Sequence, residues 1–108
     1  MKLTVDSTPI PEGVMLVVTG EVDMESSPQL RDEIKRALKA KPAVLKLHLA
    51  AVPYIDSSGV AVLIEGMKWT KKKGVGYALV KINDSVRGVL DMSRLLPLFT
   101  IEDGDATS

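Results

Sequence analysis

The chain has 108 residues, a common size for one compact domain, and its basic and acidic side chains balance at 14 each. It therefore lacks the global positive charge expected of a nonspecific nucleic-acid binder. It contains no cysteine, which excludes thiol catalysis, cysteine-ligated zinc and disulfide frameworks and is compatible with a reducing compartment.

The first third of the chain changes from strand to helix patterning. Residues 14–20 form a β-branched run after a Pro-Glu-Gly turn, and residues 3–6 can pair with it as the other arm of a hairpin. Ser27 and Pro28 are typical of a helix start, because a serine oxygen can accept from the free amides and proline loses no hydrogen bond there. Pro42 is expected to end this helix. Its apolar stripe consists of Leu30, Ile34, Ala37 and Leu38.

Residues 43–49 are predicted to form a strand with two unlike faces. Leucines occupy every second position, whereas Lys46 and His48 lie on the other face. A strand covered by helices on both faces should be apolar throughout. The two polar residues therefore indicate that one face of the sheet is partly open to solvent. We interpret His48 as an exposed strand residue, because no second ligand motif supports a metal or general-base role.

The central helix is predicted to follow Asp56-Ser57-Ser58-Gly59 and to end at Gly74. Its apolar residues repeat at i, i+3, i+4 and i+7. The stripe consists of Val60, Leu63, Ile64 and Met67. The basic run 71–73 lies at the end of this helix, where positive charge is favourable, and we prefer that interpretation to a phosphate-binding patch.

The last third continues the alternation of strands and helices. Residues 77–82 read as a strand, Asn83 or Asp84 as the cap of a third helix, and residues 98–101 as a short final strand. Residues 107–108 are expected to fray. Single helical crossovers join the later strands, and such crossovers make parallel, right-handed connections.

We therefore predict an α/β fold. One domain over residues 1–108 should contain a mixed sheet with helices mainly on one face. The segment after residue 6 turns polar and reaches Pro9, so no apolar stretch is long enough for a signal peptide. Residues 60–64, the richest apolar segment, are far too few to cross a bilayer. A cytoplasmic protein without a membrane span is the resulting expectation.

Three segments resemble the STAS domains, and among them the bacterial stand-alone anti-sigma factor antagonists. The segments are Gly20-Glu21-Val22-Asp23 after the second strand, Tyr54-Ile55-Asp56-Ser57-Ser58-Gly59-Val60 before the central helix, and Asp91-Met92-Ser93 with Leu95. The order of elements also matches, so the resemblance covers nearly the whole chain. It implies that an anti-sigma factor serine kinase phosphorylates Ser57 and that a PP2C-type phosphatase reverses the reaction. The unphosphorylated form would bind the anti-sigma factor and release a sigma factor.

The residues themselves suit such a switch. Ser57 and Ser58 precede a helix, so one hydroxyl can cap it while the other stands near its unpaired amides. Helix N-termini stabilise anions, so the fold should tolerate a phosphate of about −1.5 to −2 charge. Near Asp56, and near Asp23 as the resemblance places it, that charge should weaken binding to a partner. Simple capping and turn chemistry would explain the same four residues.

The residues predicted to bind the partner surround this segment. They are Gly20, Glu21, Asp23, Asp56, Ser57, Ser58, Gly59, Val62 and Trp69. The helical period places the last two opposite Ile64 and Met67. Trp69 could pack against a neighbouring helix or contact a partner, and we expect it to be substantially exposed.

Other functions find less support in the sequence. A hydrolase using Ser57 would need a Gly-x-Ser-x-Gly elbow and a partner base, yet His48 is the only histidine. Neither a P-loop nor a Gly-x-Gly-x-x-Gly turn is present, so we expect no enzyme activity, cofactor or metal. The serious alternative is another STAS role, as a subunit regulating a phospholipid-transport ATPase or as the cytoplasmic part of an anion transporter.

Overall fold

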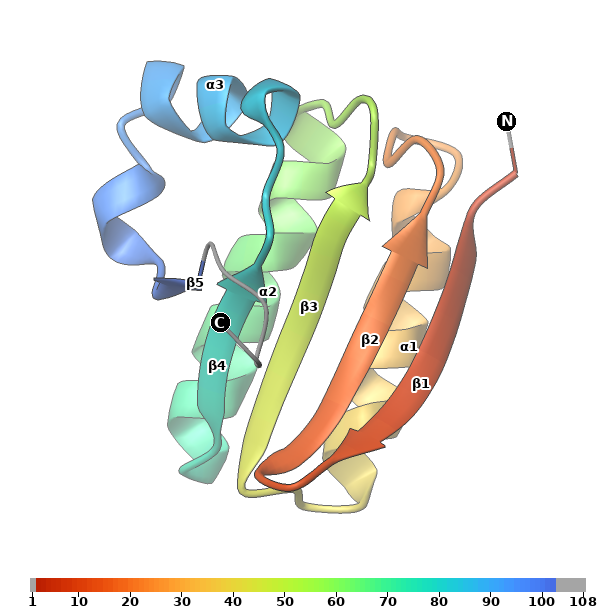
Figure 1. Cartoon of the computed structure of the whole chain (residues 1–108), viewed down its shortest axis with the longest axis vertical. Coiled ribbons are helices and arrows are strands. Elements are labelled where there is room, and N and C mark those ends of the chain that lie inside the picture. The colour runs from red at the N-terminus through yellow and green to blue at the C-terminus, as the bar shows by residue number, and fades with distance from the viewer. Residues whose placement is uncertain (1, 103–108) are drawn as a thin grey trace.

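A computed structural model describes residues 2–102 of the chain, and the expected fraying of residues 107–108 lies outside this range. Strands and helices alternate after an initial hairpin (Figure 1). The elements in chain order are β1 (Thr4–Ile10), β2 (Gly13–Thr19), α1 (Ser27–Lys39), β3 (Val44–Ala51), α2 (Ser57–Lys73), β4 (Gly76–Val80), α3 (Asp84–Met92), a 3-10 turn (Leu96–Leu98) and β5 (Ile101–Glu102).

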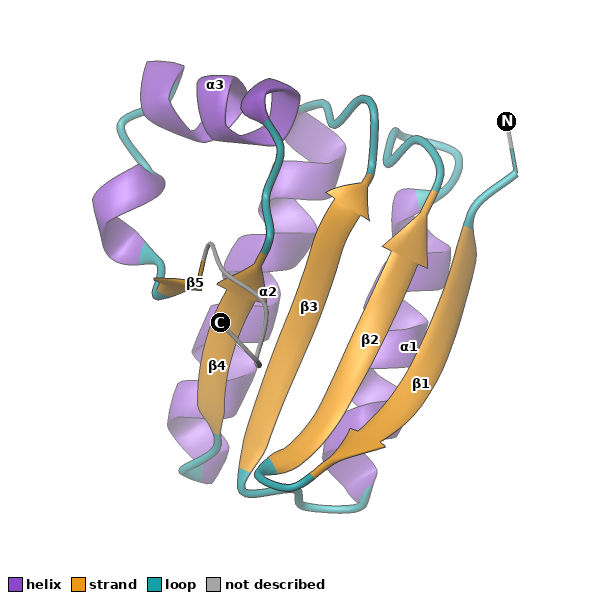
Figure 2. Cartoon of the chain, in the orientation of Figure 1, coloured by secondary structure: helices purple, strands orange, loops and turns teal. Residues whose placement is uncertain are grey.

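The order of strands in the sheet is the order in the chain, β1-β2-β3-β4-β5. β1 is antiparallel to β2, and all other neighbours are parallel. When each right-handed crossover leads to the next strand on the same side of the previous one, all the crossover helices lie on one face of the sheet. α1 and α2 accordingly lie together behind the sheet, and α3 crosses beyond the end of β4 (Figure 2). The predicted α/β fold with a mixed sheet and one-sided helices is confirmed.

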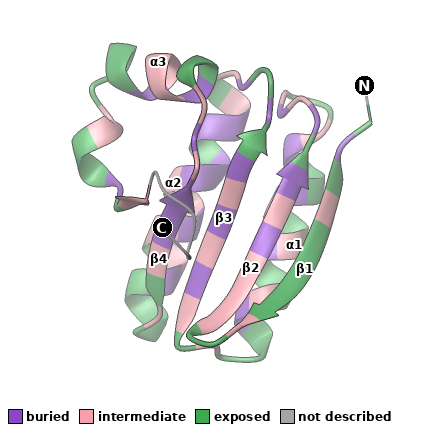
Figure 3. Cartoon of the chain, in the orientation of Figure 1, coloured by how far each residue is buried: buried purple, intermediate pink, exposed green. Residues whose placement is uncertain are grey.

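The core lies between the sheet and these two helices. The leucines predicted to share one face of β3 are fully buried, and β3 alternates between buried and half-buried residues (Figure 3). Three apolar residues of α1 meet them with at most 2% exposure: Leu30, Ile34 and Leu38. Full burial of such side chains stabilises the fold by about 1.5–3 kcal/mol each relative to exposure.

The central helix α2 turns a wider arc to the core than the predicted stripe. Val60 and Leu63 are buried as expected, whereas Ile64 and Met67 are only half-buried. Val62 has no exposed surface, so the prediction that it faces away from the core is wrong. The reason is that α2 packs against both β4 and α1, which covers two sides of the helix.

Element boundaries follow local chemistry. Gly74 ends α2 with a left-handed φ of 71°, and the Asn83 side chain caps α3 by accepting from the Val86 amide at 2.9 Å, both as predicted. The prediction of a final strand over residues 98–101 begins too early, because residues 96–98 form a 3-10 turn with a proline at its second position. Only Ile101–Glu102 joins the sheet, beside the end of β4.

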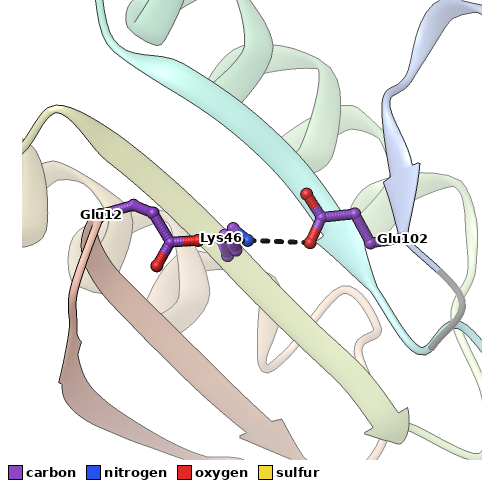
Figure 4. A network of polar contacts seen from close by, with 3 residues as sticks. All are labelled: Glu12, Lys46 and Glu102. Carbon is purple, nitrogen blue, oxygen red and sulfur yellow. Dashed lines mark hydrogen bonds and ion pairs between the residues drawn. The ribbon is translucent and has the colours of Figure 1, made fainter. Parts of the chain in front are cut away.

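The helix-free face of the sheet carries a polar network centred on β3 (Figure 4). The Lys46 ammonium donates to Glu102 at 2.8 Å and to Glu12 at 3.1 Å, linking β3 to β5 and to the hairpin turn. These bonds, that to Glu102 above all, raise the pKa of Lys46. His48 is half-buried on the same face rather than exposed, and its Nδ1 has no hydrogen-bond partner within residues 2–102. The face is thus only partly open.

Candidate functional site at the start of the central helix

Two loops meet where the parallel strands β2 and β3 end. Val22 forms an isolated parallel bridge with Ile55, and its N–H donates to the Tyr54 carbonyl at 3.0 Å. The Asp56 N–H donates to the Val22 carbonyl at 3.1 Å. The segment 20–23 therefore lies directly beside the start of α2, which is where the resemblance placed it.

Two glycines allow close packing around these loops, Gly20 against the start of β1 and Gly59 against the loops themselves. Gly20 has a φ of 115°, and a Cβ there would lie 2.9 Å from the carbonyl oxygen of Lys2. At Gly59, in the first turn of α2, a Cβ would lie 2.6 Å from Ile55 Cγ1 and 2.7 Å from Val22 Cγ1. The first turn of α2 therefore rests on the two joined loops because position 59 has no side chain.

Asp56 is the residue that caps α2. Its Oδ1 accepts from the amides of Ser58 at 2.9 Å and Gly59 at 3.2 Å, and its carbonyl accepts from the Val60 amide at 3.0 Å. The prediction that a serine hydroxyl caps this helix is wrong. The capping interpretation of the aspartate is correct, and three amides of the first turn are already satisfied by this one residue.

Ser57 stands outside this arrangement. It is exposed at the first position of α2, whereas Ser58 is half-buried. The Ser57 hydroxyl makes no hydrogen bond with any other part of the chain that the structure describes. Of the two serines, Ser57 is thus the more accessible to an enzyme, and its hydroxyl carries no structural task in the described residues.

Asp23 holds the turn that leads into α1. Its Oδ1 accepts from the amides of Glu25 and Ser26, both at 3.0 Å, and these bonds, that from Ser26 first, lower the pKa of Asp23. The Ser26 hydroxyl donates to the Glu21 carbonyl at 2.7 Å. Ser27 begins α1 as predicted but is buried, and the residue before it, Ser26, makes no side-chain cap. The turn interpretation of Asp23 is therefore correct, and its ionised carboxylate remains beside the site.

Two predicted contact residues on α2 lie elsewhere. Val62 is fully buried and presents no surface to a partner. Trp69 is half-buried, packs against the core and lies under the Lys35 ammonium of α1, which is 5.3 Å from the ring centroid. The packing interpretation is correct for Trp69, and the expectation of substantial exposure is wrong. Lys35 also forms a cation–π contact with the ring.

Sequence reasoning missed two apolar residues beside the site. Met24 is 77% exposed and directly follows Asp23, and Tyr54 is 50% exposed and directly precedes the bridged Ile55. Large apolar side chains in loops, outside any core periodicity, are the signal that could have identified them. Exposed apolar residues near a polar site are typical of protein contact surfaces.

Two further features of the described residues concern metal ligands and membrane-spanning helices. Residues 2–102 contain no group of three or more His, Asp or Glu side chains arranged to hold a metal ion. No helix in this described range combines the length and the apolar character needed to cross a membrane.

Comparison with known proteins identifies the family. The model of the STAS domain matches residues 5–106. The anti-sigma F factor antagonist of Paenibacillus polymyxa is 30% identical over 98 residues, which cover 89% of this chain and 84% of that protein. Its name describes a regulator and not an enzyme, in line with the expectation from sequence.

Solved structures share the fold. An anti-sigma factor antagonist from Mycobacterium paratuberculosis superposes with a TM-score of 0.87 at 22% identity, covering 95% of this chain and 87% of that chain. The Bacillus cell fate determinant SpoIIAA in its phosphorylated form gives a TM-score of 0.72 at 19% identity, covering 96% and 94%. The chain therefore belongs to the STAS domain family and is homologous to bacterial anti-sigma factor antagonists.

Proposed function

We propose that this protein is an anti-sigma factor antagonist that works as a phosphorylation-controlled partner switch in the cytoplasm. The unphosphorylated form binds an anti-sigma factor serine kinase and so releases a sigma factor, the kinase phosphorylates Ser57, and a PP2C-type phosphatase restores the first state. The whole of residues 1–108 acts as one STAS domain. The observation that carries the proposal is the exposed Ser57 hydroxyl, which begins α2 without a hydrogen bond in the described residues.

The relatives support the two halves of this proposal. The Paenibacillus relative is named an antagonist of an anti-sigma factor, and SpoIIAA has been solved in a phosphorylated form. Binding, and not catalysis, is the activity that such names describe. We assign no catalytic residue and no cofactor.

The capping geometry explains how a phosphate acts without unfolding the domain. Asp56 already holds the amides of Ser58 and Gly59, so a phosphate on Ser57 cannot use them unless it displaces the carboxylate. Most hydrogen bonds of the dianion would therefore come from water, beside the charges of Asp56 and Asp23. Burial against a partner would remove that water and add repulsion, which weakens binding.

The contact surface combines the predicted residues with the two exposed apolar side chains. It consists of Glu21, Asp23, Met24, Tyr54, Asp56, Ser57 and Ser58, whereas the predicted Gly20 and Gly59 are buried and contribute through the close packing beneath this surface. Met24 and Tyr54 supply apolar area, while the carboxylates and hydroxyls give the rim its polarity. Phosphorylation of Ser57 would add its charge directly to this surface.

The test combines site mapping with affinity. The protein is incubated with the purified cognate kinase and ATP, the phosphorylated residue is identified by mass spectrometry, and affinity for the kinase is measured before and after. Ser57→Ala should fold, resist phosphorylation and stay bound, whereas Ser58→Ala should still be phosphorylated. Phosphate on Ser58, or unchanged affinity after full modification of Ser57, would contradict the proposal.

The transporter role gives a different result in the same system. Co-purification from the native cell should recover a small ATP-binding kinase. Recovery of a transporter ATPase subunit or an anion transporter, with no kinase, would replace the sigma pathway with the alternative.

A further inference from the structure

The end of the molecule opposite Ser57 collects positive charge. α1 and α2 both run from the site toward the opposite end, where β3 and β4 begin (Figure 1). The Gly76 N–H donates to the Ala43 carbonyl at 2.9 Å, which joins the loops that follow the two helices. We call this region the basic end. Its lysines are Lys35, Lys39, Lys41, Lys71, Lys72 and Lys73.

Within residues 2–102, no ion pair compensates the charge of the basic end. All six lysines are exposed, and none forms an ion pair within residues 2–102. The two carboxylates near this end are held by other cations: Glu12 by Lys46 at 3.1 Å and Glu33 by Arg36 at 3.1 Å. Because the whole chain is neutral, the rest of it carries the balancing acidic excess.

Two hollows shape the basic end. One, of about 290 Å³, lies between α1 and α2, and its lining is Lys35, Leu38, Lys39, Trp69 and Lys73. The other, of about 500 Å³, lies between the loops, and its lining is Lys41, Pro42, Ala43, Lys73, Gly74 and Val75. Ammonium groups therefore surround half-buried apolar surface that includes the indole of Trp69.

Helix electrostatics explains only part of this arrangement. Lysines in the last turn are favourable at the negative end of a helix dipole, which accounts for Lys39 and the run 71–73. Lys35 lies one turn earlier, over the indole, and Lys41 lies beyond the helix in the left-handed region with a φ of 52°. Six like charges at one end repel one another, and an anionic partner would relieve that repulsion.

We propose that the basic end docks on an anionic lipid surface. Polybasic clusters near an anionic leaflet are attracted to it, and tryptophan with lysine is the residue pair that favours the membrane–water interface. The six cations are all lysines, whereas specific recognition of bases and bidentate binding of phosphates favour arginine. The neutral chain also lacks the overall charge of a nucleic-acid binder.

Docking in this way leaves the phosphorylation site free. The molecule measures 30 Å along its longer axes, and electrostatic effects are screened over about 8 Å at physiological salt. Ser57 would face away from the membrane. Membrane binding should therefore be independent of the phosphorylation state, which makes this inference testable apart from the proposed function.

The test is sedimentation with vesicles of phosphatidylcholine, with and without phosphatidylglycerol, at physiological salt. The protein should bind only the anionic vesicles, and high salt should release it. Each lysine near the surface contributes about a fivefold change in partitioning, so Lys39→Gln with Lys73→Gln should weaken binding by about 25-fold. Trp69, the only tryptophan, should become less accessible to acrylamide on binding.

Lys39→Gln alone should weaken binding by about fivefold, and Lys2→Gln is its matched control, because it also removes one positive charge, near Gly20 at the other end of the molecule. Lys2→Gln should leave vesicle binding unchanged, and so should Ser57→Asp. Equal losses for Lys2→Gln and the basic-end variants would overturn the proposal. So would tight binding to a DNA duplex or to polyglutamate without binding to anionic vesicles, which would assign the basic end to another polyanion.

Discussion

The Asp56 side chain caps α2, and the two serines that follow it are therefore not needed as caps. Three adjacent residues, Asp56, Ser57 and Ser58, all have oxygen atoms suited to a helix cap, and the sequence does not distinguish among them. The structure assigns the cap to Asp56, which leaves the Ser57 hydroxyl available for modification. The motif predicts a candidate site at the start of the central helix, and this position is where the two loops meet. The division of labour within it depends on side-chain direction, which no local pattern encodes.

Removal of the cap should therefore separate the roles of these residues. Asp56→Ala should lower the free energy of unfolding by about 0.5–2 kcal/mol, because the Ser58 and Gly59 amides lose their acceptor. Ser57→Ala should change it by less than about 0.5 kcal/mol. Urea denaturation measures both. A larger loss for Ser57→Ala than for Asp56→Ala would show that the serine is structural.

Gly59 provides a second test at this scale. Gly59→Ala should destabilise the protein by about 1–3 kcal/mol, because the new methyl group would overlap Val22 and Ile55. Gly88, within α3, is the control: a Cβ there meets nothing within 4 Å, so Gly88→Ala should be neutral or stabilising by up to about 1 kcal/mol. If the two variants unfolded at the same urea concentration, the close packing at position 59 would be disproved.

Apolar periodicity and cap residues predict the three α-helices of the described chain, but the apolar stripe predicted for the central helix is too narrow. A stripe of i, i+3, i+4 and i+7 residues describes a helix that packs on one neighbour. α2 packs on two, so Val62 is buried and Ile64 is half-buried. The second neighbour, α1, is distant in sequence, and its contact with α2 could not be predicted from the pattern within α2.

Leu63 measures the contribution of the shared core face. Leu63→Ala should lower the free energy of unfolding by about 2–5 kcal/mol, because Leu63 is fully buried between the sheet and the helices. Ile64→Ala should cost less, since its side chain is half-buried. Thermal and urea unfolding would show the ranking, and a reversed order would mean that the face of α2 is assigned wrongly.

The Lys46 network, which links β3 to β5 and to the hairpin turn, makes stability depend on pH at both extremes. Lys46 has a raised pKa, so its contribution to stability is complete below 10.5 and is lost as the pH rises through the folded-state value. Glu12 has a lowered pKa, through its own backbone amide and then Lys46, so its contribution is present above 4.5 and is lost as the pH falls.

Hydrogen exchange can follow this network. The Lys81 amide donates to the Glu102 carbonyl at 2.7 Å, so it should exchange faster in Lys46→Gln than in the parent protein at neutral pH. The Leu47 amide serves as the reference. It lies on β3, like Lys46, but in the middle of the sheet, and its exchange should be unaffected. Unchanged protection of Lys81 would show that the two-residue strand holds without the ammonium group.

The fold of the whole molecule could be predicted from the alternation of its elements. Single crossovers of one hand leave few topologies, and Lys46 with His48 showed that one face lacks helices. The bounds of the final strand could not be predicted, because two residues are too few to show an alternating pattern. Their pairing depends on β4 and on the distant Lys46.

The sequential order of the sheet also bears on how the chain folds. Each strand pairs with the strand just before it, so each pairing closes one short loop or one helix-containing segment, and the entropy lost at each closure is small. Domains of mixed helices and strands fold at rates between those of helical bundles and of all-β proteins, because their parallel pairings join residues far apart in the sequence. The sheet can therefore form strand by strand in the direction of synthesis, starting from the β1–β2 hairpin. The short strand β5 pairs last, once β4 is in place.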